Sequence, residues 1–397
     1  MLKTFRYRLY PTPAQATTMQ HTLNECRWLY NHLLEQRKTA WDERGETLGY
    51  YDQNVTIPPL KAERPALKGV HSQVLQDVAV RLDLAFKAFF RRVKAGEEPG
   101  YPRFKGYGQY DSFCYPQSGY KLDGARVFLS KIGHIKAIIH RPIGGTVKTC
   151  CVRRTSTGKW FVTFSCAVED APLPVVESAI GIDVGLASFA TMSDGSEIAN
   201  PRFFRRDEQA LATAQRRLAK EPKPEKGERA TPERRRRRVV VARVHERIAN
   251  RRTDFAHQHS RRVVNAHGVI AVEDLAVNRM VHNHCLAKSI SDAAWSMFAQ
   301  FLSYKAASAG RQFIAVNPAY TTQDCSRCGH RQKLTLADRV YRCPCCGLEM
   351  GRDHNAAINI VTLGLQSLGA KTVAAHRLLA LGVVTCAGSC GRPIHRW

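Results

Sequence analysis

Four cysteines near the end of the chain constrain its fold more than any other feature of the sequence. They form two C-x-x-C pairs, fourteen residues apart: Cys325 and Cys328, then Cys343 and Cys346. Each pair places two sulfurs on one tight turn, and two such turns can close a tetrahedron of thiolates around zinc. Gly329 and Gly347 follow the pairs, where a knuckle needs permissive backbone angles. The spacing predicts a zinc ribbon rather than four unrelated core cysteines.

Cys345 is a further cysteine beside the second pair. Choosing it in place of Cys346 would break the two-residue spacing, so we assign Cys346 as the ligand. Four thiolates leave no open coordination position, which makes the expected single Zn²⁺ structural rather than catalytic.

Seven other cysteines show no ligand spacing. Because thiols stay reduced in the cytosol, we expect these side chains to be buried as small apolar groups rather than joined in disulfides. They are Cys26, Cys114, Cys150, Cys151, Cys166, Cys285 and Cys386. Cys386 and Cys390 with His376 and His395 could bind a metal, but we expect residues 371–397 to form a disordered tail, since chain ends usually fray.

The chain is strongly basic. Its 60 Lys and Arg against 34 Asp and Glu give a net charge of +26, and its 397 residues suggest two or three domains. A surplus of this size attracts polyanions, so nucleic acid is the expected partner. An anionic membrane is the alternative, but the chain starts without an apolar signal core and Leu378–Val384 is too short to span a bilayer. We therefore predict a cytoplasmic protein with no membrane partner.

The first 170 residues alternate between strand-like and helix-like patterns. Residues 3–10 alternate bulky and basic side chains as a half-buried strand does, and Thr12 with Pro13 begins a helix that runs to about residue 41. Residues 45–65 contain Gly and Pro without a period and are expected to be a loop. A second helix follows, and short strands broken by glycines over residues 100–168 favour a small barrel or sandwich.

An α/β pattern follows a Pro-rich linker at residues 171–174. Its apolar segments alternate between strands and helices, as in α/β domains. We predict strands at 179–185, 188–192, 268–272 and 313–316 and a helix at 291–309.

Residues 202–262 are the most basic stretch, with 20 Lys and Arg against 8 Asp and Glu. Pro222 and Pro224 divide the stretch into two helices. A solvated helical hairpin is the ordinary explanation of such a charge run. The surplus exceeds what solubility needs, so we favour an arm that contacts phosphates. The contacts are expected above all from Arg234, Arg235, Arg236, Arg237 and Arg238.

Three acidic residues lie where a charge is costly. Asp183 falls inside an apolar strand, Glu273 ends another, and Asp353 begins a helix just beyond the second knuckle. A buried carboxylate needs a metal ion or a cation, and Mg²⁺ prefers carboxylate oxygens. Paired ions can activate water and stabilise the leaving oxygen in phosphodiester cleavage. The alternatives are a turn role for Asp183 and a capping role for Glu273 or Asp274.

Residues 101–121 interleave aromatic and basic side chains. Aromatic rings stack on exposed bases while cations hold phosphates, a combination suited to single strands or distorted duplexes. We expect about half of the rings to belong to a barrel core instead. The rings are Tyr101, Phe104, Tyr107, Tyr110, Phe113, Tyr115 and Tyr120, and the cations are Arg103, Lys105 and Lys121. The predicted nucleic-acid contacts in this segment are Arg103, Phe104, Lys105 and Tyr107.

The motifs of this chain, taken together and in their order along the sequence, closely resemble those of the TnpB family. The members of this family are transposon-encoded RNA-guided nucleases ancestral to type V CRISPR effectors. The resemblance rests on Gly181-Ile-Asp183-Val-Gly185, Val272-Glu273-Asp274-Leu275, the two cysteine pairs, and Arg352-Asp353-x-Asn355-Ala-Ala-x-Asn359-Ile360. Upstream pieces match as well: Tyr7-Arg-Leu-Tyr-Pro-Thr-Pro13, Arg81-Leu-Asp-x-Ala-Phe-Lys-x-Phe-Phe90, Pro102-Arg-Phe-Lys105 with Ser112-Phe113, and Ile290-Ser-Asp-Ala-Ala-Trp295. The resemblance runs from residue 3 to about residue 362.

The resemblance implies a multidomain α+β fold. Residues 173–316 and 349–370 would form a RuvC-type RNase H-like α/β nuclease domain, including the basic hairpin 202–262, with a zinc ribbon inserted at 317–348. Residues 1–12 and 98–172 would form a wedge-like β-barrel with a helical recognition domain inserted at 13–97. Asp183, Glu273 and Asp353 would be the catalytic residues and would hold two Mg²⁺ ions.

The function that the resemblance implies is that of a metal-dependent endodeoxyribonuclease. A guide RNA from the transposon end would pair with target double-stranded DNA, which the protein would cut next to a short adjacent motif. We expect a monomer in a bacterial or archaeal cell, associated with the nucleoid when bound. The alternatives are a nuclease-silent RNA-guided repressor, against which the three acids argue, and a transposase proper. A zinc-ribbon transcription factor would leave Asp183 and Asp353 without a purpose.

Overall fold

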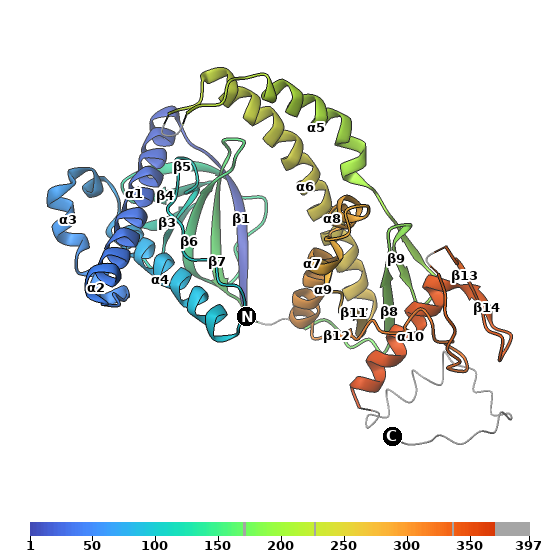
Figure 1. The fold of residues 1–397 in the computed structure, drawn as a ribbon. Helices are drawn as coiled ribbons and strands as arrows, with labels where there is room; N and C mark the ends of the chain where they lie inside the picture. Colours follow the sequence, from blue (N-terminus) through green and yellow to red (C-terminus); the bar gives the residue numbers. More distant parts are fainter. Residues whose placement is uncertain (170–171, 226–227, 336, 370–397) are drawn as a thin grey trace. The chain divides into compact units, whose positions relative to one another are not determined.

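The computed structural model describes residues 1–169, 172–225, 228–335 and 337–369 (Figure 1). The chain divides into two units, Met1–Glu169 and Asp170–Trp397, each with its own hydrophobic core. The tail predicted at residues 371–397 lies outside the described residues. No helix in the described part of the chain has the length and apolar character that a membrane crossing requires.

The first unit is built on one antiparallel sheet with the strand order β2-β6-β7-β1-β5-β4-β3. Its strands are β1 (Leu2–Tyr10), β2 (Ser112–Tyr115), β3 (Tyr120–Asp123), β4 (Arg126–Leu129), β5 (Gly133–Ile138), β6 (Thr146–Arg154) and β7 (Trp160–Ala167). Only four residues join the edge strands β2 and β3, so the sheet must curl back on itself. The Tyr115 hydroxyl donates to the Ser130 carbonyl (2.9 Å), and its ring lies 6.5 Å from that of Tyr120. The sheet is therefore a nearly closed barrel, the first of the two predicted alternatives.

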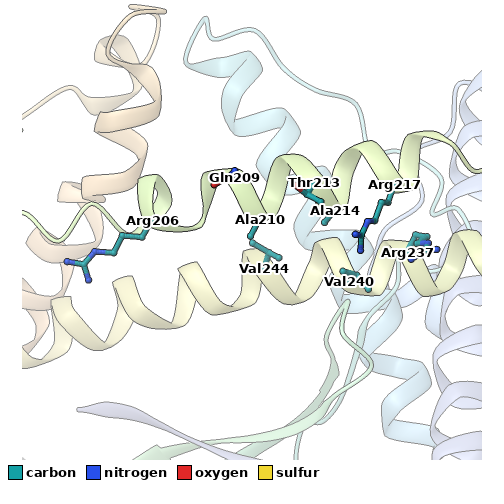
Figure 2. Close-up of a pocket in the computed structure, with 9 residues that line it drawn as sticks. All are labelled: Arg206, Gln209, Ala210, Thr213, Ala214, Arg217, Arg237, Val240 and Val244. Carbon is teal, nitrogen blue, oxygen red and sulfur yellow. The ribbon is translucent and has the colours of Figure 1, made fainter.

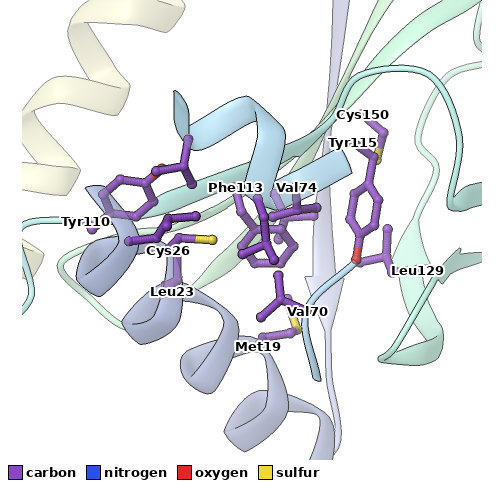
Figure 3. Packing of buried hydrophobic residues seen from close by; sticks show 14 of the residues in the cluster. Met19, Leu23, Cys26, Val70, Val74, Tyr110, Phe113, Tyr115, Leu129 and Cys150 are labelled. Carbon is purple, nitrogen blue, oxygen red and sulfur yellow. The ribbon is translucent and has the colours of Figure 1, made fainter. Parts of the chain in front are cut away.

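Two long helices, α1 (Pro13–Arg44) and α4 (Ser72–Lys94), pack against β2. The start predicted for α1 is confirmed. Thr12 accepts a hydrogen bond from the Gln15 backbone, while the Gln15 side chain accepts one from the Thr12 backbone, which completes a capping box. Figure 3 shows the buried side chains that join these elements. They include Met19, Leu23 and Cys26 of α1, Val74 of α4, and Phe113 of β2.

The prediction of a loop over residues 45–65 is wrong. The segment contains three short helices: α2 (Tyr50–Asn54), α3 (Ile57–Glu63) and the start of a 3₁₀ helix (Pro65–Gly69). Pro58 and Pro59 lie in the first turn of α3, where a missing N–H breaks no helical hydrogen bond. Ile57 and Leu60 are buried and fix this short helix to the core.

The second unit has a mixed sheet with the order β10-β9-β8-β11-β12. Its strands are β8 (Ala179–Val184), β9 (Ser188–Met192), β10 (Glu197–Ala199), β11 (Val269–Glu273) and β12 (Gln312–Val316), and four of these lie where the sequence predicted strands. β8, β11 and β12 are parallel, whereas β9 and β10 are antiparallel. Helices cover both faces: α6 (Pro232–Ala266) and α9 (Trp295–Ala309) pack on one, and α10 (Arg352–Ser367) packs on the other (Figure 1). The helix predicted at 291–309 begins instead at Trp295, because Ala294 has a left-handed backbone (φ 57°) that ends α8 (Ala287–Ala293).

The basic stretch forms the predicted helical hairpin, α5 (Phe203–Ala219) and α6. Leu211, Val244 and Ile248 make a small core between the two helices. Asp207 of α5 is buried and accepts hydrogen bonds from Arg247 (2.7 Å) and Arg251 (3.0 Å) of α6. Part of the positive charge of the hairpin is therefore used inside the protein.

The cysteine predictions need two corrections. Cys114 and Cys151 form a disulfide, because they lie directly opposite each other on β2 and β6, with their Cα atoms 4.0 Å apart. This cross-strand register has no counterpart in the spacing along the chain. Cys285 is exposed rather than buried, whereas Cys26, Cys150 and Cys166 are buried as predicted, and Cys386 lies outside the described residues.

The approach of α10 to the sheet depends on Gly181. A Cβ atom at this position would lie 2.0 Å from the Ala357 carbonyl oxygen and 2.7 Å from the Val361 nitrogen of α10. No side chain other than that of glycine fits against a helix backbone at this distance. The absence of a side chain at Gly181 therefore lets the backbone of α10 lie directly against β8.

Replacing Gly181 with Ala should displace α10 and make the second unit about 1–3 kcal/mol less stable, the usual cost of overpacking. Denaturant unfolding followed by circular dichroism measures the loss. Gly351→Ala is the matched control, because a Cβ at Gly351 would lie 3.9 Å from its nearest neighbour, an ordinary contact. Equal stability of the two variants would show that α10 does not need this glycine.

Candidate functional site

The two cysteine pairs form knuckles with the same backbone pattern. The Cys325 N–H donates to the His330 carbonyl and the Cys343 N–H to the Leu348 carbonyl, five residues on in each case. Gly329 and Gly347 have φ values of 73° and 70°, the left-handed region that favours glycine. The second knuckle is framed by the short strands β13 (Val340–Arg342) and β14 (Glu349–Gly351).

The knuckles bring four thiols into one cluster. Within the described residues, Cys325, Cys328, Cys343 and Cys346 have ligand atoms that all lie within 4.8 Å of one another. The sulfurs of Cys325 and Cys346 are 3.6 Å apart, and those of Cys328 and Cys343 are 3.5 Å apart. A tetrahedral zinc with bonds of about 2.3 Å needs sulfurs about 3.8 Å apart, so the cluster fits this ion. Cys345 is exposed and does not belong to the cluster.

The three predicted acids come from two strand ends and one helix start. β8 and β11 are parallel neighbours, and Ile182 lies opposite Val272. The next residue on each strand is an acid, Asp183 on β8 and Glu273 on β11, so the two acids lie at the same level of the sheet. Side chains alternate along a strand, which puts both acids on the face of Gly181 and Ala271, where α10 packs. Asp353 lies in the first turn of α10.

The electrostatics of the site show that these carboxyl groups interact. Asp183 is only 9% exposed. Its burial, followed by the negative charges of Glu273 and Asp353, raises the pKa of Asp183 to about 8. Burial also raises the pKa of Glu273, against the lowering effect of a hydrogen bond from Thr321. A divalent cation would relieve the repulsion, and carboxylates are the ligands that Mg²⁺ prefers, so the chemistry of the three side chains suits that ion. Within the described residues, however, only the four cysteines have ligand atoms close enough together to form a metal-binding group.

Arg352 is the cation nearest to the third acid. Its Nε and Nη2 atoms donate to one Asp353 oxygen at 3.0 and 2.9 Å. Its Nη1 atom donates to the Thr335 carbonyl (3.3 Å), and its backbone N–H donates to the Arg339 carbonyl (2.9 Å), both in the ribbon. Arg352 therefore links the zinc ribbon to Asp353.

Sequence reasoning assigned no role to three polar residues that organise the site. Asn355 and Asn359, four residues apart on one face of α10, both donate to the Asp324 carbonyl (2.8 and 2.7 Å). The Thr321 hydroxyl donates to Glu273 (2.5 Å). The i, i+4 spacing of the two asparagines was a visible signal, whereas nothing in the sequence pairs Thr321 with Glu273.

The five predicted arginines of the hairpin do not share one environment. Arg234 is buried and donates to the carbonyls of Leu218 (3.3 Å) and Glu221 (2.6 Å), so it closes the hairpin and is not free to contact a phosphate. Arg235, Arg236, Arg237 and Arg238 are exposed. Arg237, with Arg206 and Arg217, borders a groove of about 590 Å³ between α5 and α6 (Figure 2). Its floor is apolar, formed by Ala210, Ala214, Val240 and Val244.

The aromatic segment divides as predicted, with some rings in the core and others exposed. Tyr110, Phe113 and Tyr115 are buried, Tyr120 is partly buried, and the three rings nearer the start are 46–64% exposed: Tyr101, Phe104 and Tyr107. Arg103 is exposed as well. The backbone of Lys105 is fixed by the Asn31 side chain: the Lys105 N–H donates to Asn31 Oδ1 (2.7 Å), and Asn31 Nδ2 donates to the Lys105 carbonyl (3.0 Å).

Three family models match the chain. A model described as "Probable transposase" matches residues 163–284, and one described as "Cas12f1-like, TNB domain" matches residues 295–360, which include the four cysteines. A model described as "Helix-turn-helix domain" matches residues 1–46. In this structure, residues 1–46 contain the strand β1 and the helix α1 rather than two helices.

Similar proteins match over nearly the whole chain. Two carry the name "Putative RNA-guided DNA endonuclease". The one from Streptomyces pristinaespiralis is 34% identical over 371 residues, which cover 91% of this chain and 89% of its own. The other, InsQ of Escherichia coli K12, is 32% identical over 414 residues, covering 99% and 96%. The solved "Structure of the mini-RNA-guided endonuclease CRISPR-Cas_phi3" covers 92% of both chains at 9% identity, with a TM-score of 0.45, too low to support an inference.

Replacing Cys328 with Ser should abolish zinc binding, because three thiolates and a hydroxyl hold the ion far more weakly than four thiolates. Metal analysis of protein purified without chelator should find about one zinc per wild-type chain and close to none in the variant. Cys345→Ser is the matched control, since this exposed thiol lies beside the cluster and should leave the zinc content unchanged. Equal zinc loss in both variants would contradict the assignment of the four ligands.

Proposed function

Because the chain belongs to the TnpB family of RNA-guided DNA endonucleases, we propose that it cuts double-stranded DNA at a site selected by a guide RNA. The guide, transcribed from the transposon end, would pair with one DNA strand, and the protein would read a short adjacent motif and the backbone of the heteroduplex. The observation that carries the proposal is the placement of the three acids: Asp183 and Glu273 lie near the carboxyl ends of the parallel neighbours β8 and β11, and Asp353 lies in the first turn of α10, which packs on the same face of the sheet.

The mixed sheet with these acids supports a RuvC-type, RNase H-like nuclease domain. Asp183, Glu273 and Asp353 would hold the catalytic Mg²⁺ ions. Two such ions, when bound, activate water and stabilise the leaving oxygen of a phosphodiester. The chain's own contribution is to keep Asp183 out of water and to pack α10, which carries Asp353, on the face of the sheet that carries Asp183 and Glu273. The zinc ribbon would be structural.

Exposed basic surfaces in both units support binding to RNA and DNA. In the second unit these are the arginines of the hairpin and the groove between α5 and α6. In the first unit, the exposed Arg6 has its guanidinium group over the Phe161 ring, at 3.9 Å. Arg8 lies over the same ring at 5.2 Å, but it is partly buried and its Nη1 atom is out of solvent. A ring that holds the exposed Arg6 guanidinium in place favours its contact with phosphates.

Asp183→Asn tests the nuclease. The amide keeps the shape of the side chain but removes a negative charge, so Mg²⁺ should bind poorly and cleavage should slow by more than about 100-fold, beyond the usual effect of a residue that only supports a ligand. Guide and target binding should persist, because base pairing and Lys/Arg contacts supply affinity separately. Cleavage and binding are measured on one substrate in Mg²⁺, with the exposed Asp254→Asn as control. Undiminished cutting by Asp183→Asn would refute the nuclease proposal.

The hairpin can be tested through the salt dependence of binding. Replacing Arg235, Arg236 and Arg238 with Ala should weaken nucleic-acid binding and flatten its salt dependence, by about 0.7–0.9 in log–log slope for each phosphate that is no longer neutralised. Arg234→Ala is the contrasting variant: it removes bonds to two carbonyls and should lower the melting temperature without changing the slope. An unchanged slope in the triple variant would show that these three arginines face water and do not contact phosphates.

A further inference from the structure

Thr321 places a buried hydroxyl against one of the three acids. Its side chain is 2% exposed, and its Oγ1 atom lies 2.5 Å from Oε1 of Glu273. The Pro318 carbonyl is the other acceptor within reach, at 3.1 Å. A hydroxyl has one proton to donate, and the carboxylate is both nearer and charged, so the bond goes to Glu273.

The backbone before Thr321 is held in a conformation that aims this hydroxyl. Tyr320 has a φ of 67°, which is rare for a bulky residue and costs free energy. The Gln323 and Asp324 N–H groups donate to the Tyr320 carbonyl (2.9 and 3.0 Å), and the Arg331 guanidinium lies 3.6 Å from the centre of the Tyr320 ring. The surroundings thus maintain a strained turn whose next residue contacts Glu273.

The same loop is fastened to α10 and to the first zinc knuckle. The Asn359 side chain donates to the carbonyls of Thr321 (2.8 Å) and Asp324 (2.7 Å). Asn355 accepts from the Ser326 N–H (2.9 Å), next to Cys325, and is fully buried. A displacement of this loop would therefore reach Glu273 through Thr321 and Asp353 through α10.

We infer that Thr321 is a positioning residue for Glu273, and that through it the zinc knuckle sets the orientation in which this carboxylate holds Mg²⁺. Glu273 ends its strand, and a glutamate side chain has several rotatable bonds, so without a donor it samples several orientations. Partners that orient a ligating carboxylate typically contribute 10–100-fold in metal affinity or activity. This inference rests on the proposed function, and it adds a residue outside the three acids.

Three variants of adjacent threonines test the role. Thr321→Val keeps the shape but removes the hydroxyl, and Thr321→Ser keeps the hydroxyl. Thr322→Val is the matched control, because Thr322 is only partly buried and its side chain makes no hydrogen bond within the described residues. Guide-loaded protein is assayed for the cleavage rate at a series of Mg²⁺ concentrations, for target binding, and for zinc content.

Thr321→Val should cut about 10–100-fold more slowly and need more Mg²⁺ for half-maximal rate, with target binding and zinc content unchanged. Thr321→Ser should restore most of the rate, and Thr322→Val should match the wild type. The inference is overturned if Thr321→Val cuts with the wild-type rate and Mg²⁺ dependence, or if the serine variant is as slow as the valine variant.

A measurement without cleavage separates this inference from the proposed function. The melting temperature of each zinc-loaded, magnesium-free protein is followed as Mg²⁺ is added, because an ion that binds only the folded state stabilises it. A rise in the wild type that needs higher Mg²⁺ in Thr321→Val supports the positioning role even if no substrate is cut, in which case only the proposed function fails. Identical titrations of the two proteins, or no rise in either, overturn the inference.

Discussion

The contact between Gly181 and the backbone of α10 is the interaction on which the second unit depends. It lets a helix lie directly on the strand that carries Asp183, and so it brings Asp353 of that helix to the ends of β8 and β11. The same packing removes water from Asp183, which is the first cause of its raised pKa. The contact that assembles the site therefore also makes the site unfavourable for negative charge unless a cation is present.

Features that depend on local spacing could be predicted from the sequence. The two cysteine pairs are a short-range pattern, and β8 and β11 are marked by apolar runs that contain an acid inside the strand (Asp183) or end at one (Glu273). The environment of Arg234 could not be predicted, because five consecutive arginines look alike until the helix phase shows which one points at the Leu218 carbonyl. The Cys114–Cys151 disulfide depends on strand register, and the Thr321–Glu273 bond depends on a left-handed Tyr320, which no propensity of tyrosine suggests.

The distribution of charge shows why a net charge overstates a binding surface. Arg247 and Arg251 bind Asp207, and Arg252 binds Asp292, which also caps the N–H of Phe204 at the start of α5. These arginines hold the hairpin together and attach it to α8, so part of the charge that they add to the total of +26 is neutralised within the protein. Exposed arginines such as Arg235, Arg236 and Arg238, for which no ion pair to a buried acid is found within the described residues, are the better candidates for contact with nucleic acid. One basic segment thus combines an internal ionic framework with an external surface.

The position of the zinc ribbon in the chain also affects the order in which the protein can fold. The chain leaves the sheet at Val316 and returns at Arg352, so 35 residues separate the last strand of the sheet from the helix that completes the site. Closing a flexible loop of that length costs about 3 kcal/mol in chain entropy. A ribbon already closed by its metal removes most of this cost before α10 docks, because the two knuckles hold the intervening residues together. We therefore expect the ribbon to fold early and the acids to meet last, so that the ability to cut appears only after the cell has supplied zinc.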